Sequence, residues 1–294
     1  FAVGEWRSVL VLSIKSLPTG ATRRYRPRMS LPADYHMHTP LCRHAKGEPI
    51  EYAVRALELG LPEIGFSDHS PVEHDDQDDW RMLAGELGEY VAKVQHARDT
   101  YPALPIRLGL EVDFIPGHEP WIEEMAQRHD WDYFIGSVHY ISGKWDFDNP
   151  KRLAEWAEHD VDEVWADYFN RLTNAAASGL FQIIGHPDLP KKFGHRPTRD
   201  CTGLYLNFLA ACESTGTCVE LNTAGLRKDC AEIYPNLEFL KLAKSANVQI
   251  TFGSDAHATH EVGMNLEDAA NLAREVGYDQ CCRFNGREKA AVAI

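Results

Sequence analysis

Histidine and carboxylate side chains recur along the chain at spacings that suit metal binding. The candidate ligands are seven histidines and three carboxylates: His36, His38, His44, Asp68, His69, Glu111, His139, His186, Asp255 and His257. His36 and His38 are two residues apart, so on a strand both project from one face and can bind a single ion. Asp255 and His257 repeat this spacing. Imidazoles combined with carboxylates favour zinc, manganese or iron, whereas calcium and magnesium prefer oxygen ligands.

The size of this set predicts more than one ion. A mononuclear catalytic zinc has about three protein ligands, so ten candidates indicate two or three divalent ions that share a carboxylate. Glu111 is the expected bridge. No cysteine belongs to the set, which excludes a structural zinc finger.

Such a cluster favours phosphate-ester hydrolysis. Clustered ions lower the pKa of a bound water and neutralise the charge that builds up on phosphoryl oxygens. A phosphate dianion also needs cationic donors away from the ions, and Lys191, Lys192 and Arg227 each follow a predicted strand end. Arginine binds phosphate bidentately and lysine as a point charge. We expect at least one of the three to contact phosphate, with an exposed surface position as the alternative for each lysine.

The elements that must position these residues form an alternating pattern from residue 33 onward, which is typical of an α/β fold. The predicted strands span 33–38, 63–68, 106–114, 133–139, 181–186, 218–222 and 249–255. The predicted helices between them span 48–59, 83–100, 120–128, 161–177, 203–215 and 236–246. Seven strands with helical crossovers predict a TIM-like barrel one strand short. Active sites of such barrels lie at the C-terminal ends of the strands, where the candidate ligands occur.

Charge separates the beginning of the chain from the rest. Residues 1–30 carry a net charge of +5. Since the whole chain carries −14, the remaining residues carry −19. Residues 1–28 show no sustained helical or strand periodicity and precede Met29. We therefore expect 1–30 to be a flexible or non-native basic leader and 31–294 to be a single domain. An acidic body disfavours nucleic acid, which demands clustered lysine and arginine, and suits a small substrate with divalent cations.

Cysteine usage and hydropathy predict the compartment. The seven cysteines are odd in number and include no CxxC pair, so they predict reduced thiols and no disulfide framework. No window approaches the roughly 18 apolar residues of a membrane span. We therefore expect a cytoplasmic protein with no membrane partner. The sequence carries no signal for an oligomeric state.

Six motifs, in this order, resemble those of the polymerase-and-histidinol-phosphatase (PHP) superfamily. They are Asp34-Tyr35-His36-Met37-His38-Thr39, Phe66-Ser67-Asp68-His69, Gly109-Leu110-Glu111-Val112-Asp113, Gly136-Ser137-Val138-His139, Gly185-His186-Pro187-Asp188 and Gly253-Ser254-Asp255-Ala256-His257. The longer strings 136–140, 186–194 and 220–228 are similar to the monofunctional histidinol-phosphatase branch. The resemblance implies a distorted (β/α)7 barrel with its active site at the C-terminal ends of the strands.

The resemblance also implies a trinuclear site. The first ion would take His36, His38, Glu111 and Asp255, the second Glu111, His139 and His186, and the third His44, His69 and His257. Asp68 would orient a ligand without binding metal. The implied reaction is hydrolysis of L-histidinol phosphate to L-histidinol and phosphate in histidine biosynthesis, by metal-activated hydroxide. Glu111, Asp255 and Arg227 would be catalytic, and Arg227 and Lys192 would bind the phosphate.

Three alternatives stay open. The first is another PHP-type phosphoesterase that acts on a nucleotide or a different small phosphate monoester. The second is an amidohydrolase-like metal enzyme, which shares the His-x-His pair but usually has a metal-bridging lysine at a strand end; no predicted strand here ends in lysine. The third is a non-enzymatic PHP module, which loss of several ligands would indicate, whereas all ten are present.

Overall fold

A parallel β-sheet that curls into a barrel organises the protein. The computed structural model describes residues 31–74, 77–141 and 145–294, so the expected leader lies outside the described residues. The strand order is β1-β2-β3-β6-β7-β8, with every neighbouring pair parallel. The strands are β1 (Ile64–Phe66), β2 (Ile106–Asp113), β3 (Tyr133–Ser137), β6 (Ile183–Ile184), β7 (Cys218–Asn222) and β8 (Ile250–Gly253). The predicted α/β fold is confirmed.

The extended segment 33–38 closes the circle between β1 and β8. On one side the Gly65 amide donates to the Asp34 carbonyl at 2.8 Å, and on the other the Tyr35 amide donates to the Phe252 carbonyl at 3.1 Å. We predicted a regular strand over 33–38, but the structure shows only isolated bridges there. The segment shares its backbone groups irregularly between two neighbours, which produces the distortion of the (β/α)7 barrel.

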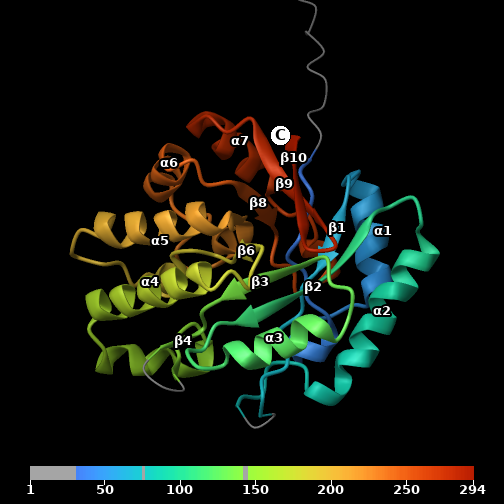
Figure 1. Ribbon diagram of the computed structural model, residues 1–294, viewed down its shortest axis with the longest axis horizontal. Helices are drawn as coiled ribbons and strands as arrows, with labels where there is room; N and C mark the ends of the chain where they lie inside the picture. The colour runs from blue at the N-terminus through green and yellow to red at the C-terminus, as the bar shows by residue number, and fades with distance from the viewer. Residues whose placement is uncertain (1–30, 75–76, 142–144) are drawn as a thin grey trace, which may run out of the picture.

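Helices surround the barrel, and neighbours in the chain pack against each other in the pairs α1–α2, α4–α5, α5–α6 and α6–α7. In Figure 1, α4, α5 and α6 lie on one side of the sheet, and α1 and α2 lie on the opposite side. The helices are α1 (Pro49–Leu59), α2 (Leu87–Thr100), α3 (Glu119–Gln127), α4 (Val161–Ala177), α5 (Thr202–Thr215), α6 (Leu237–Ser245) and α7 (Leu266–Val276). Short 3₁₀ turns are η1 (Pro40–Cys42), η2 (Ala84–Glu86), η3 (Pro150–Glu158), η4 (Leu189–Phe193), η5 (Thr223–Arg227) and η6 (Thr259–Glu261).

Local signals explain where these helices begin and end. Helix α1 has Pro49 in its first turn and a capping box between Glu48 and Glu51, and it ends at Gly60 in the left-handed region. At the start of α4, the Asp160 side chain accepts from two backbone amides of the first turn. The predicted helices therefore agree with the structure to within a few residues at their ends.

Two hairpins and the last helix were not predicted. The hairpin of β9 (Gln280–Asn285) and β10 (Glu288–Ala293) follows α7, and β4 (Tyr140–Ile141) pairs with β5 (Trp145–Asp146). Strand β9 packs on the barrel beside β8. The Thr251 hydroxyl donates to the Cys282 carbonyl at 3.2 Å, so the C-terminal hairpin is attached at the start of the strands, opposite the ligands.

Aromatic rings fill the barrel at that end. Tyr35, Tyr133 and Phe284 are fully or almost fully buried and meet with ring centroids 5.3 to 5.9 Å apart. The Tyr133 hydroxyl donates to the Tyr35 carbonyl at 2.6 Å, which ties β3 to the closing segment. The Tyr133 ring fits only because Gly65 and Gly109 have no side chains on this face.

Covalent links and membrane spans complete the description of the fold. All seven cysteines are free thiols, as expected. Among the helices of the described residues, none combines the length and the apolar character that crossing a bilayer requires.

Gly109→Ala tests how tightly the barrel interior is packed. A Cβ at this position would lie 2.6 Å from the Tyr133 ring, and a buried aromatic ring cannot shift cheaply. We expect the free energy of unfolding to fall by about 1–3 kcal/mol, as measured by chemical denaturation. Gly203→Ala is the matched control, because a Cβ there meets open space at the start of α5. Equal stability of the two variants would contradict this packing.

Candidate metal centre

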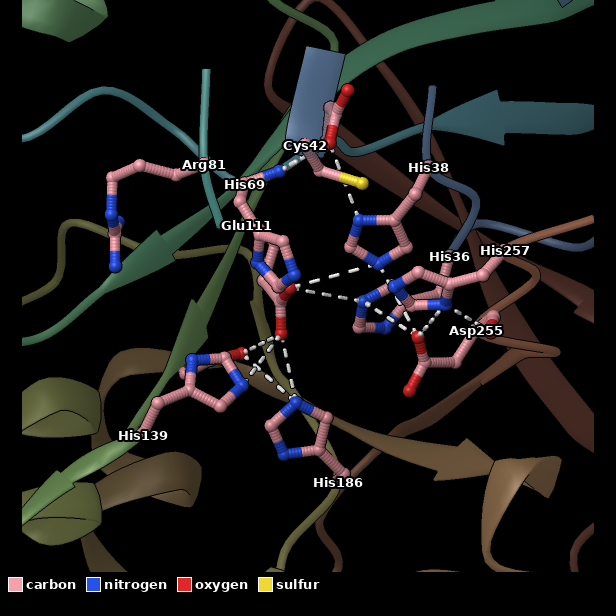
Figure 2. A network of polar contacts seen from close by, with 12 residues as sticks. His36, His38, Cys42, His69, Arg81, Glu111, His139, His186, Asp255 and His257 are labelled. Carbon is pink, nitrogen blue, oxygen red and sulfur yellow. Dashed lines mark hydrogen bonds and ion pairs between the residues drawn. The ribbon is translucent and has the colours of Figure 1, made fainter. Parts of the chain in front are cut away.

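The nine side chains expected to bind metal converge at the C-terminal end of the barrel. Figure 2 shows most of them pointing into one space around Glu111, from strands and loops that are far apart in the sequence. Glu111 lies on β2, and His36 and His38 lie on the closing segment 33–38. His44 follows the turn η1, and the other five follow the ends of β1, β3, β6 and β8. The barrel thus brings together residues that the sequence separates by up to 221 positions, as with His36 and His257.

Glu111 occupies the centre of the group. Its two carboxylate oxygens lie between 2.7 and 3.7 Å from a nitrogen of five histidines: His36, His38, His69, His139 and His186. The Ser137 hydroxyl also donates to Oε1 at 2.7 Å. No other carboxylate in the described part of the chain faces so many imidazoles, and this position suits a bridge between ions.

The spacing of the first donor group fits a bound metal. His36 Nε2 and His38 Nε2 lie 3.9 and 3.3 Å from Asp255 Oδ1, and 3.5 and 3.7 Å from Glu111 Oε2. Two ligand atoms that each lie about 2.1 Å from a tetrahedral zinc are roughly 3.4 Å apart. Both Nε2 atoms and Oε2 are buried without a hydrogen-bond partner. Buried polar atoms without partners are costly, so these atoms are arranged to bind a cation.

Two further donor groups adjoin the first. His186 Nε2 approaches Glu111 Oε1 at 2.8 Å, with His139 Nε2 at 3.5 Å from the same oxygen. On the other side, donor atoms of His38, His69 and His257 all lie within 4.8 Å of one another. The His44 ring stacks on His257 with centroids 4.6 Å apart. The described geometry therefore offers room for the three donor groups that the resemblance implies.

A cysteine also joins this region, which the sequence did not indicate. Buried Cys42 has its sulfur within 4.8 Å of donor atoms of His44 and His257. Although burial and the charge of Asp68 oppose it, hydrogen bonds with His38 and His44 lower the pKa of the Cys42 thiol. Its only sequence signal is its position two residues before His44.

Carboxylates hold the far nitrogens of the candidate ligands. Glu220 Oε1 lies 2.7 Å from His36 Nδ1, and Asp113 Oδ1 lies 2.9 Å from His139 Nδ1. Asp68 Oδ1 lies 3.4 Å from His38 Nδ1, where the resemblance implied an orienting residue. Such partners fix the ring orientation and raise the basicity of the ligand. Glu220 and Asp113 were not predicted; both are buried carboxylates near the C-terminal ends of largely apolar strands, which is the signal that marks them.

The electrostatics favour ionised carboxylates. Burial alone would raise the pKa of Glu111, but His36, His69 and His139 hold it well below its ordinary value. Asp255 behaves in the same way: His36 and His38 lower its pKa despite burial. Burial disfavours the charged form of His139, yet Asp113 and Glu111 raise its pKa to about 9. Burial instead holds the pKa of His69 and His257 well below the ordinary value, so only some of the histidines favour a proton, which metal binding would release.

Strained backbone occurs at three residues in two of these loops. His186, Asp188 and Asp255 have φ values of +26°, +71° and +52°, which non-glycine residues rarely adopt. Asp188 is held by its contacts, since its Oδ2 accepts from the Asn236 amide at 2.8 Å. Such strain concentrates at functional sites, where the surrounding structure maintains it.

A cavity of about 580 Å³ opens beside the donor groups. Its wall includes His44, His69, Glu111, His139, His186, Asp255 and His257, and it also includes Lys192, Arg227 and Lys228. A ligand that reached the metal-binding atoms would therefore meet these three cationic side chains, while a fourth, Lys151, is exposed and pairs with Asp79. Trp80 covers part of the opening, with its ring 4.7 Å from that of His69.

The structure corrects the expectation for Lys191. Its ammonium is completely buried and donates to Asp188 at 3.0 Å, to the Ile233 carbonyl at 2.8 Å and to Glu232 at 3.0 Å. With all three protons used and no exposure to the cavity, Lys191 cannot contact a phosphate there. The left-handed turn at Asp188 aims this side chain inward, and the sequence gives no sign of that direction.

Lys228 lines the cavity, where we had expected Lys191. No residue in the described part of the chain forms a hydrogen bond or ion pair with its ammonium, although Lys192 and Arg227 are close enough to repel it. Burial and these neighbours lower the pKa of Lys228. Arg227 is held by Glu261 at 3.2 Å and by the Ser254 carbonyl at 2.8 Å, but its Nη1 has no partner. The cavity therefore presents free cationic donors for an anion.

Glu111→Gln tests the bridging position. The amide keeps the shape but loses the charge that compensates several ligands at once, so we expect lower metal content by elemental analysis. The rate of phosphate release should fall by more than the roughly 10- to 100-fold typical of an outer partner. Glu123→Gln, exposed on α3, is the control and should change neither. Full metal content and activity in Glu111→Gln would remove this residue as the bridge.

Comparisons with known proteins identify the family of this chain. The PHP domain model matches residues 34–224. A probable histidinol-phosphatase of Deinococcus radiodurans is 45% identical, covering 83% of this chain and 93% of its own. The histidinol-phosphatase of Bacillus subtilis is 29% identical, and the match covers 80% of this chain and 96% of that protein. A Lactococcus lactis histidinol phosphate phosphatase, solved with zinc, L-histidinol and phosphate, shares the fold with a TM-score of 0.76 at 20% identity, over 88% and 98% of the two chains. The chain is therefore a member of the PHP domain family.

Proposed function

We propose that the protein is a metal-dependent histidinol-phosphatase, which hydrolyses L-histidinol phosphate to L-histidinol and inorganic phosphate in histidine biosynthesis. The observation that carries this function is the convergence of metal-donor atoms around Glu111 beside a cavity with free cationic donors. The relative that is 45% identical is named a probable histidinol-phosphatase, and the match covers 93% of its length.

The site would bind two or three divalent ions, with zinc, manganese or iron as the candidates. His36, His38, Glu111 and Asp255 would hold one ion, and Glu111, His139 and His186 a second. His44, His69 and His257 would hold a third. When bound, such ions activate water and neutralise the charge that develops on the phosphoryl group. Glu220, Asp113 and Asp68 support this set through the Nδ1 atoms described above.

The remaining work of the protein is to bind and orient the phosphate ester. Arg227 offers its unpaired Nη1, and the carbonyl and carboxylate contacts of its other nitrogens keep the guanidinium beside Asp255. Lys228 offers an ammonium that loses no partner when an anion arrives. Lys192 lies in the same wall. We propose these three as the phosphate-binding residues. Arg227 is held in place before the anion binds, and a donor fixed in advance favours the more highly charged transition state.

Substrate comparison is the direct test of the function. Phosphate release should be fastest, by kcat/KM, with histidinol phosphate when compared with a nucleoside monophosphate and p-nitrophenyl phosphate. A chelator should abolish it, and added zinc or manganese should restore it. A nucleotide hydrolysed more efficiently than histidinol phosphate would favour another PHP-type phosphoesterase. Activity that survives complete metal removal would reject the mechanism.

Lys228→Gln distinguishes the two lysine assignments. Because the free ammonium contributes one charge-assisted contact, we expect kcat/KM to fall by about 10-fold or more, with inhibition by inorganic phosphate weakened in parallel. Lys241→Gln, exposed on α6 and paired only with Glu238, is the control. Lys191→Gln should instead lower the melting temperature, because it leaves Asp188 buried without its cation. Unaltered kinetics of Lys228→Gln would reject its role.

A further inference from the structure

An ion pair stands in the cavity wall between Lys192 and Asp148. Lys192 Nζ donates to Asp148 Oδ2 at 2.9 Å and to the Asp148 carbonyl at 2.8 Å. Both side chains are mostly buried, with 15% and 17% of their surfaces exposed, and both line the cavity. A cation that is proposed to bind phosphate thus has a carboxylate as its immediate neighbour. A carboxylate repels phosphate, so its presence in a phosphatase cavity requires a reason.

Only one oxygen of Asp148 is used by this pair. No described residue donates a hydrogen bond to Oδ1. Although burial opposes ionisation, the charges of Lys192, His139 and His186 keep the pKa of Asp148 below its ordinary value. The ion pair with Lys192 at 2.9 Å itself requires a charged carboxylate. Asp148 lines the same cavity as His139 and His186, two candidate metal ligands.

The other acidic residues of the cavity are committed elsewhere. Glu111 and Asp255 belong to the donor groups. Asp146 accepts from the Trp80 indole, the Asn149 amide and Arg152 at 2.7 to 3.1 Å. Glu261 holds Arg227 and accepts from the His257 amide. Asp79 is exposed at the rim and pairs with Lys151. Among the described residues that line the cavity, Asp148 is thus the mostly buried carboxylate outside the donor groups that has an oxygen available to a ligand.

We infer that the Lys192–Asp148 pair is a receptor for a phosphate ester that carries an ammonium group next to the ester carbon: Lys192 turns to the phosphate, and Asp148 accepts the ammonium. Histidinol phosphate has this structure, since two carbon atoms separate its amine from the ester oxygen. When such a substrate binds, its phosphate replaces Asp148 as the partner of Lys192. Its ammonium replaces Lys192 as the partner of Asp148. No buried charge is left unpaired when the pair opens, and an unpaired buried charge would be strongly destabilising.

This inference rests on the proposed function and adds the basis of its selectivity. A simple phosphate monoester satisfies Lys192 but leaves Asp148 facing the phosphate without a counter-ion. An ester with the adjacent amine satisfies both residues. A site built to pair a polar group of its substrate strongly rejects an analogue that lacks that group. Asp148 therefore acts by binding substrate, and nothing in the geometry requires it to transfer a proton.

The test compares histidinol phosphate with imidazolylpropyl phosphate, which lacks only the amine. For the metal-loaded wild-type enzyme, we expect kcat/KM to favour histidinol phosphate by about 10- to 100-fold. In Asp148→Asn this preference should collapse, because kcat/KM falls on the amine-bearing ester and stays within about 3-fold on its analogue. Asp79→Asn removes the same charge from the rim and should keep the preference.

Product inhibition separates this role from a merely structural one. Histidinol carries the amine without phosphate, so Asp148→Asn should weaken its inhibition by about 10-fold or more. Inhibition by inorganic phosphate should be unchanged or stronger, because Lys192 is no longer held by a carboxylate. A variant that only damages the site would lose both. Circular dichroism and metal analysis accompany each variant.

The outcomes differ for the two hypotheses. If wild type hydrolyses both esters equally well, the inference is wrong whatever the variant does, while the phosphatase assignment stands. Equal losses on both esters in Asp148→Asn, in a folded and metal-loaded protein, also overturn it, since Asp148 would then serve only to hold Lys192. If wild type hydrolyses neither ester, the proposed function fails and the inference fails with it.

Discussion

A carboxylate buried among five imidazoles is the constraint on which the rest of this structure depends. Glu111 has almost no access to solvent, and an ion moved from water into a protein interior costs several kcal/mol unless charges and hydrogen bonds compensate. Here the histidines around it supply the compensation, and their own far nitrogens are held by Glu220, Asp113 and Asp68. The central carboxylate is thus surrounded by histidines, and these histidines are in turn paired with the outer carboxylates. A divalent cation at the centre satisfies the donor atoms that have no other partner.

The barrel makes this arrangement of buried charges possible. Parallel strands deliver their last residues to one end, and the closing segment 33–38 places His36 and His38 directly beside the end of β8. The opposite end is filled by Tyr35, Tyr133 and Phe284, so the walls have a rigid base. Stability and function are thus divided between the two ends of the same strands, as in other barrels.

Much of the site could be predicted from sequence because metal donors are recognisable by type and strand ends by apolar period. The nine ligand candidates converge for this reason. Periodicity does not give the direction of a side chain in an irregular turn, which is why Lys191 was placed in the cavity and Lys228 was not. The outer carboxylates Glu220 and Asp113 lie within buried strands, and pairing across the barrel identifies their partners only in three dimensions. The C-terminal hairpin was missed because β10 is largely exposed and its pattern lacks a buried face.

The closure of the barrel by its first segment has a consequence for how the protein acquires metal in the cell. His36 and His38 emerge from the ribosome early, whereas Asp255 and His257 follow some two hundred residues later. Until then the first donor group has His36, His38 and Glu111 but lacks Asp255. The geometry that can hold an ion is therefore complete only when β8 docks beside the closing segment, at the last stage of synthesis.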